Sequence, residues 1–293
     1  MAVPVQMIRL GVIGVAIASF VTFKYVAAGM VEDKIGMAMT KSGLSSDTLS
    51  YDASVDLFGF NTHLHDITIN LPGQAPIEID EVIINDFDTN HDIPEYMDIE
   101  IEGIKAKKML SSPLLANASQ GLFREMETVN TNFAIKYMFD SDDKILDIKE
   151  ISESVDGLGK ISFSTVLHNI ASMKALPQIV MMNPKSILIG KSELAYEDDS
   201  LVEKLMLINA KKENISVAEY KGKMLVELNK ELVKAKKEEK SDLKKDFLST
   251  IISFIKSPDT LEISINPQTP MNLQAMTKTN PEKLIKKLNL EIN

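Results

Sequence analysis

The chain has 293 residues and contains neither cysteine nor tryptophan. Without cysteine it forms no disulfide, and thiol nucleophiles, zinc fingers and cysteine-bound iron–sulfur clusters are excluded. The absence of tryptophan makes a carbohydrate-binding function less favoured, because such sites often stack sugars on tryptophan rings. Basic side chains are also scarce, because 32 Lys and Arg face 42 Asp and Glu, a net charge of −10. Binding to phosphates needs a basic face, so we expect no nucleic-acid partner.

Motifs for a reaction are missing as well. Gly190-Lys191-Ser192 imitates the end of a phosphate-binding loop, but Lys185 stands where the earlier glycine is required. The chain has no Gly-x-Ser-x-Gly elbow. Ser164 and His168 lie four residues apart at the end of a predicted strand, with no evident third partner. We therefore expect no catalytic residue and no cofactor.

Metal-ligating side chains gather in one window of the sequence. The window contains His63, His65, Asp66, His91 and Asp92. If the strands on either side of the turn at 72–76 pair, His63 faces roughly residue 85, and His91 lies about 20 Å further on at 3.3 Å per residue. Zinc ligands lie near 2 Å from one ion. We therefore expect no metal site, with His63, His65 and His91 as weak candidates only.

One apolar run without charge stands near the N-terminus, between Arg9 and Lys24. Its side chains include Leu10, Ile13, Val15, Phe20 and Phe23. A helix over this run spans about 21 Å, short of the roughly 30 Å hydrocarbon core. Residues 1–31 are therefore either a membrane anchor with longer flanks or a signal peptide cleaved after Val26-Ala27-Ala28. We predict the anchor.

Charge predicts how this anchor is oriented. Arg9 and the amino terminus are positive, whereas the charges after the run are mixed. By the positive-inside rule the N-terminus is cytoplasmic. Abundant Lys, Ile and Asn suggest a bacterial source with an AT-rich genome. We therefore expect a single-pass protein of a bacterial inner membrane, with the lipid bilayer as a partner. Residues 32–43 extend the helix, and residues 44–293 form an extracytoplasmic domain in the periplasm.

Residues 44–198 are predicted to be rich in strands, because apolar and polar residues alternate with a period of two. The expected strands cover 49–57, 60–71, 77–87, 96–104, 129–139, 144–152, 158–167 and 186–196. Ser112-Pro113 begins a helix that runs to about residue 128, and a short helix is expected near 169–182.

Residues 199–293 are predicted to be rich in helices. Ser200-x-x-Glu203 and Ser216-x-x-Glu219 both have the spacing of a capping box ahead of an apolar stripe. A third helix ends at Ser257-Pro258, and a strand, a short helix from Pro281 and a closing strand follow. The predicted fold class is α+β, with antiparallel β-meanders packed with helices, preceded by one N-terminal transmembrane helix.

The opening of the chain resembles AsmA-like bacterial envelope proteins. The resemblance rests on the apolar segment followed by SYDASVDLFGFNTHLHDITI and IEIDEVIIND. It implies an N-terminal membrane helix and a curved sheet in the periplasm, and it brings no catalytic motif. The chain is shorter than the large AsmA-like proteins, and its helical last third departs from their β-groove.

Together these observations predict a non-enzymatic envelope protein that scaffolds a membrane assembly or binds an amphiphilic ligand or lipid. Tyr51, Val55, Ile67 and Ile69 would line an apolar groove, although the same residues also fit an ordinary core. The alternative is a subunit of a larger complex with other membrane proteins, for which Gly14-x-x-x-Ala18 offers a small-residue face. An enzyme is the third alternative.

Overall fold

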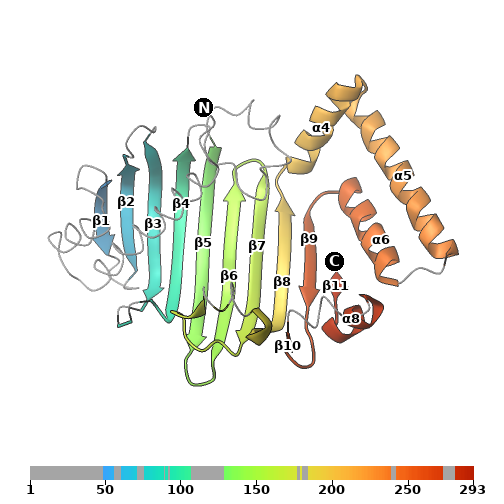
Figure 1. Ribbon diagram of the computed structural model, residues 1–293. Helices are drawn as coiled ribbons and strands as arrows, with labels where there is room; N and C mark the ends of the chain where they lie inside the picture. The colour runs from blue at the N-terminus through green and yellow to red at the C-terminus, as the bar shows by residue number, and fades with distance from the viewer. Residues whose placement is uncertain are drawn as a thin grey trace, which may run out of the picture. The chain divides into compact units, whose positions relative to one another are not determined.

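The computed structural model describes residues 49–55, 61–70, 76–88, 90–91, 93–106, 129–176, 179, 184–238, 242–272 and 281–293. The chain divides into two compact units between Tyr137 and Met138. Figure 1 shows the described strands and helices in chain order.

The predicted fold class is wrong. The described residues form mainly an eleven-stranded antiparallel sheet with four helices, 46% strand and 31% helix. Within each unit, most described strands pair with the next strand along the chain and so extend one sheet, where the prediction has separate meanders. Alternation identifies a strand, but it does not show where a sheet ends.

The strands of the first unit agree closely with the expected ranges. They are β1 (Leu49–Val55), β2 (Thr62–Ile69), β3 (Ile77–Phe87), β4 (Tyr96–Ala106) and the start of β5 (Val129–Asp140). Consecutive strands from β1 to β4 pair antiparallel. The expected helix ending near residue 128 lies outside the described residues.

One face of the first unit carries its core. Leu64, Ile67, Val82, Ile84 and Ile99 are between 1% and 5% exposed and belong to one apolar cluster. Burying a side chain of this size stabilises the fold by about 1.5–3 kcal/mol. Ile67 and Ile69 both belong to this cluster, so they lie on one strand face.

The alternation of buried and polar residues shifts by one residue at the same level of three strands. Thr62 and Leu64 face the core on β2 before the shift, and Ile67 and Ile69 face it afterwards. At this level two consecutive residues interrupt the pattern on each strand, at 65–66 on β2, 80–81 on β3 and 102–103 on β4, and β3 has a second interruption at 85–86. We call the six residues at this level the offset row. Strand pairing keeps one register on both sides of it between β2 and β3.

On β2 and β4 the shift coincides with a residue of left-handed backbone. Asp66 has φ 51° and Gly103 has φ 67°. A residue in this region re-aims the side chains that follow, as in a β-bulge. Glycine suits the second position because a Cβ there would lie 2.5 Å from Asp80 Cγ. Asp80 in turn pairs with Lys105, whose Nζ lies 2.5 Å from its carboxylate.

The second unit joins more strands to the four helices. Its strands are the end of β5, β6 (Ile145–Val155), β7 (Gly159–His168), β8 (Leu188–Asp198), β9 (Thr260–Ile265), β10 (Met271–Asn272) and β11 (Glu291–Ile292). Its helices are α4 (Leu201–Glu213), α5 (Val217–Lys237), α6 (Asp242–Lys256) and α8 (Pro281–Leu288), with a 3-10 turn η1 at Pro184–Ser186. The expected helix near 169–182 is described only in part.

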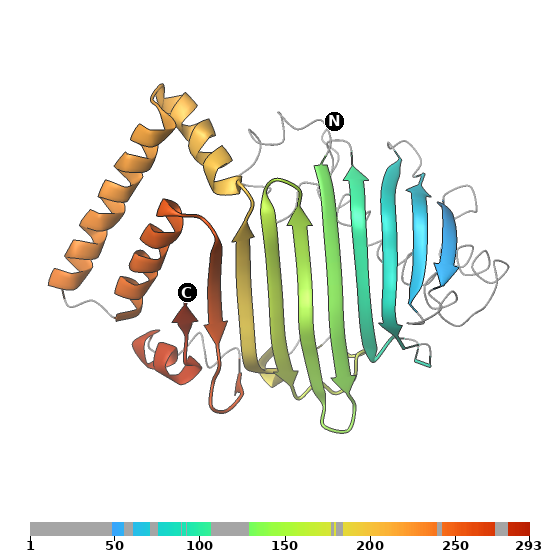
Figure 2. The same ribbon diagram turned by 180° about the vertical axis from the view of Figure 1, so that it is seen from behind.

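The three long helices stand beside the sheet of this unit and do not form a layer across it. Figures 1 and 2, seen from opposite sides, both place α6 next to β9 and α5 beyond α6. Leu248, Ile252 and Ile255 of α6 are buried. In α5 only Ala235 is buried, so most of that helix remains accessible.

One of the two expected capping boxes is present. Ser216 accepts from the Glu219 amide, and the Glu219 carboxylate accepts from the Ser216 amide at 2.9 Å, which confirms the box before α5. The Ser216 amide and hydroxyl both donate to the Glu219 carboxylate and hold its pKa below the ordinary value. The box expected at Ser200 is wrong, because Ser200 has φ 99° and its hydroxyl donates to the Gly157 carbonyl. Asp198 accepts the Val202 amide of α4 instead.

The predicted fold class, which is wrong, also included an N-terminal transmembrane helix. Within the described ranges, no helix has both the length and the apolar character needed to cross a bilayer. The segment expected to be the anchor, residues 1–31, and its helical extension, 32–43, lie outside these ranges.

Candidate functional site

Two of the three weak metal candidates lie together, and a carboxylate joins them. His63 and His65 lie on β2, and Glu81 lies on β3 directly opposite His65. His63 Nδ1 is 2.6 Å from Glu81 Oε1, and His65 Nδ1 is 3.5 Å from the same oxygen. The imidazole rings stack with centroids 5.9 Å apart. We call these three residues the His–His–Glu cluster.

The cluster is partly shielded from water. The side chains of His63, Glu81 and His65 are 18%, 25% and 41% exposed. Ser54 Oγ lies 3.1 Å from the second ring nitrogen of His65. One ligand atom from each member lies within 4.8 Å of the others, an arrangement that can hold a metal ion.

The third weak candidate, His91, has a different partner. Its Nδ1 lies 2.7 Å from Asp88 Oδ2, in the loop after β3. Asp88 is 1% exposed and also accepts the amides of Asn90 and Glu95. Burial raises the pKa of the Asp88 carboxyl, but the three hydrogen bonds lower it by a larger amount. The pKa of Asp88 is therefore below its ordinary value. Asp88 organises this loop and shares no site with His63. Asp92, which falls in the same window, lies outside the described residues.

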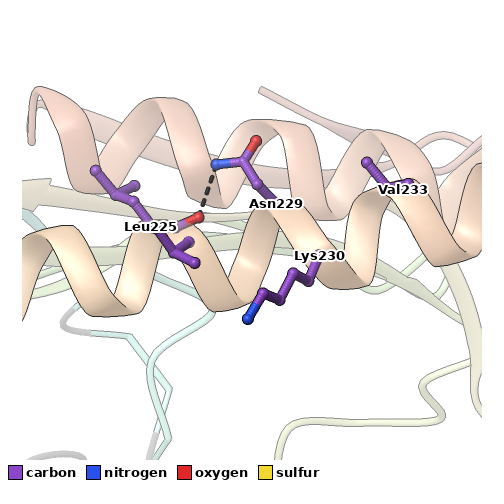
Figure 3. A pocket seen from close by; sticks show the side chains of 5 residues that line it. Leu225, Asn229, Lys230 and Val233 are labelled. Atoms are coloured by element: carbon purple, nitrogen blue, oxygen red, sulfur yellow. Dashed lines mark hydrogen bonds between the residues drawn. The ribbon is translucent and has the colours of Figure 1, made fainter.

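A second candidate surface lies on α5. Leu225, Val226, Asn229, Lys230 and Val233 line a shallow open hollow on one side of this helix. Figure 3 shows Leu225, Asn229 and Val233 along the helix, with the Asn229 amide donating to the Leu225 carbonyl at 2.7 Å. Val226 is 55% exposed and Val233 is 51% exposed. We call these five residues the α5 face.

Lysines follow this face along the helix. Lys223, Lys230 and Lys237 recur every seven residues, so they lie on one line beside the valines. Lys223 also pairs with Glu213 of α4 at 3.1 Å. A Cβ added at Gly222 would meet no atom within 4 Å, so the helix backbone is open to close approach there.

The other residues considered for catalysis or phosphate binding in the sequence all lie within strands β7 and β8. Ser164 and His168 both lie on β7, four residues apart, which is about 13 Å along a strand. Gly190-Lys191-Ser192 lies within β8, as expected for a strand rather than a phosphate-binding loop. Ser192 Oγ lies 2.6 Å from Thr165 Oγ1 of the neighbouring strand.

Three of the four expected groove residues lie in the apolar core of the first unit or against it. Ile67 and Ile69 are 5% and 6% exposed within the apolar cluster of the first unit. Tyr51 is partly buried against that cluster, and nothing is described for the side chain of Val55. The anchor residues lie outside the described ranges; they are Leu10, Ile13, Val15, Phe20 and Phe23.

Comparison with known proteins adds one match. Residues 152–293 match the model of a family described as "Uncharacterized protein". No curated protein and no solved structure matches the chain. The matched range contains the α5 face and not the His–His–Glu cluster.

Sequence reasoning missed both Glu81 and the α5 face. Glu81 enters the cluster through strand register, because it pairs with His65 across β2 and β3. In the sequence, the larger apolar residues Tyr220, Met224 and Leu228 indicated a different buried side of this helix. In the structure these three side chains are only half-buried. The seven-residue recurrence of Val226 with Val233 is the signal that points to it.

Proposed function

We propose that this protein is a non-enzymatic scaffold of the bacterial cell envelope that joins a membrane assembly through the α5 face. In this proposal residues 1–31 attach it to the inner membrane and the described units lie in the periplasm. The observation that supports it most directly is the pair Val226 and Val233, each more than half exposed on a helix that stands away from the sheet.

The arrangement of side chains favours a helix as the partner. Val226 and Val233 recur after seven residues, and Asn229 lies between them. In two-stranded coiled coils, β-branched residues recur in this way, and a single buried Asn fixes the register. The open side of Gly222 lets a second backbone come near. We infer a docked helix with an apolar stripe of about two heptads.

Charge favours an acidic flank on that helix. α5 carries six lysines and three glutamates, in a chain whose net charge is −10. Lys230 and Lys237 border the valines on one side. Positions beside a coiled-coil seam select the partner through opposite charges. The proposed partner is therefore an envelope protein that presents an amphipathic helix with acidic residues along one edge.

The amphiphile alternative receives less support. It requires Ile67 and Ile69 to line an open groove, and both are core residues of the first unit. An acyl chain would have to displace packed neighbours to reach them. The scaffold requires no such rearrangement, because its contact residues are already exposed.

Site-specific crosslinking tests the scaffold. A photoreactive amino acid replaces Val226 in the full chain, expressed in bacterial cells and extracted in mild detergent after irradiation. We expect one discrete adduct whose crosslinked peptide is a helical segment with acidic residues on one edge. The double reversal Lys230→Glu with Lys237→Glu should abolish the adduct, because it places like charges against that edge.

The same helix supplies the control. Glu231 is exposed on the side of α5 opposite the valines, so a photoreactive residue there should not give the adduct. Equal adducts from both positions, or none from Val226, would refute the proposal. An adduct between two copies of this chain would replace the proposed partner with self-association.

A further inference from the structure

We infer that the His–His–Glu cluster is a binding site for a divalent transition-metal ion of the zinc class. The inference concerns the first unit and is independent of the scaffold. Imidazole nitrogen suits zinc, copper, iron and nickel, and a carboxylate oxygen completes a common zinc ligand set. Three protein ligands leave one coordination position for water.

The distances between the ligand atoms fit such an ion closely. Bonds of about 2.0–2.1 Å in tetrahedral geometry place two ligand atoms about 3.3–3.4 Å apart. His65 Nδ1 and Glu81 Oε1 are 3.5 Å apart. His63 Nδ1 and Glu81 Oε1 are 2.6 Å apart, so rotation of the Glu81 carboxylate by less than about 1 Å at the oxygen makes room for the ion.

The backbone holds the three side chains in place. His63 and His65 are two residues apart on β2, so they project to the same face. Glu81 is the register partner of His65, and directly opposed residues have Cβ atoms about 4.5–5.5 Å apart. All three positions lie on strands, and His65 and Glu81 also belong to the offset row. A site on paired strands needs little ordering when the ion binds.

A neighbouring strand supplies the partner that a ligating histidine needs. Metal-bound histidines hydrogen-bond through their second ring nitrogen, which fixes the orientation of the ring. The second nitrogen of His65 lies 3.1 Å from Ser54 Oγ on β1, while Nδ1 faces Glu81. The ring is therefore already oriented with Nδ1 toward the proposed ion.

The surrounding charge favours a cation. Asp52 is opposite His65 on β1, and Glu102 is opposite Glu81 on β4. These acidic residues border the cluster on both sides, in a chain of net charge −10. A hydrogen-bonded histidine–carboxylate pair alone would explain His63 with Glu81, but it would not require a second histidine stacked at 5.9 Å with its Nδ1 toward the same oxygen.

Titration of the full chain with zinc chloride tests this inference. The protein is purified in mild detergent, stripped with a chelator and studied by calorimetry, with cobalt chloride as a visible-absorption probe of ligand geometry. We expect one equivalent to bind. His63→Gln and His65→Gln should each weaken binding by more than the roughly 10- to 100-fold that loss of an outer partner costs. Ser54→Ala should fall within that range.

His91 supplies the matched control, because its Nδ1 also lies 2.7 Å from a carboxylate oxygen, while the candidate metal group among the described residues does not include it. His91→Gln should leave the affinity unchanged. Circular dichroism shows whether each variant is folded, and His65, the most exposed member of the cluster, is the safest substitution. The inference is overturned if the wild-type chain binds no zinc saturably, or if folded His65→Gln binds it as tightly as wild type.

Discussion

Replacing Gly103 by alanine should destabilise the first unit. The left-handed φ of 67° costs a residue with a Cβ about 1–2 kcal/mol. The added Cβ would also lie 2.5 Å from Cγ and 2.7 Å from Cβ of Asp80. The Asp80 Cβ is fixed to the backbone of β3, so the two strands must separate. Together these effects amount to about 2–4 kcal/mol.

Thermal unfolding followed by circular dichroism measures this loss. For a protein of this size about 1 kcal/mol lowers the melting temperature by about 2–4 °C, so Gly103→Ala should melt at least about 4 °C lower. Gly222→Ala is the control, because its Cβ meets no atom and alanine in a helix gains about 0.5–1 kcal/mol over glycine. Its melting temperature should rise slightly.

A second substitution separates the two causes. Asparagine tolerates left-handed backbone better than alanine but carries the same Cβ. If backbone strain dominates, Gly103→Asn is milder than Gly103→Ala. Equal losses would show that the contact with Asp80 destabilises the variants more than the backbone strain does. A wild-type melting temperature for both variants would refute our account of the offset row.

Two pH dependences follow from Tyr137 and Asp88 of the first unit. Burial, and to a lesser extent the charge of Asp88, raise the pKa of Tyr137 to about 12, so the unfolded chain ionises first and stability should fall between pH 10 and 12. Tyr137→Phe removes this fall and also the bond to the Pro94 carbonyl, and alkaline melting curves measure the difference. Asp88 has a lowered pKa, so its contribution is present above about pH 4 and is lost on acidification. Asp88→Asn should lower the melting temperature at pH 7 and flatten its decline in acid; an unchanged acid slope would count against the role of Asp88.

Strand positions could be predicted from the sequence because the alternation is local. The expected third strand, 77–87, coincides with β3, and the other strand ranges differ from the structure by a few residues at their ends. The offset row could not be predicted in the same way. The row includes left-handed backbone at Asp66 and Gly103. Alternation of apolar and polar residues does not indicate which residue of a strand will adopt this conformation. The sheet as a whole was missed because alternation carries no information on which strands share a sheet.

The helix caps also show that local spacing alone does not determine the structure. Ser216 and Ser200 have the same spacing to glutamate, yet only Ser216 forms the box. Ser200 lies two residues after the end of β8, and its hydroxyl donates to the Gly157 carbonyl in the turn before β7. Tyr196 anchors the same corner by donating to the Leu158 carbonyl. A tertiary partner therefore replaced a local cap that the sequence alone favours.

The His–His–Glu cluster depends on tertiary structure in a similar way. His63 and His65 share a face by spacing alone, so two ligands were visible in the sequence. The expected register placed residue 85 opposite His63, but the structure places Ile83 there. That difference of two residues keeps side chains on the same face and moves Glu81 from beyond His65 to directly opposite it. The third ligand thus follows from the exact length of the connection between β2 and β3, and changing that connection by two residues would separate Glu81 from both histidines without altering either strand's alternation.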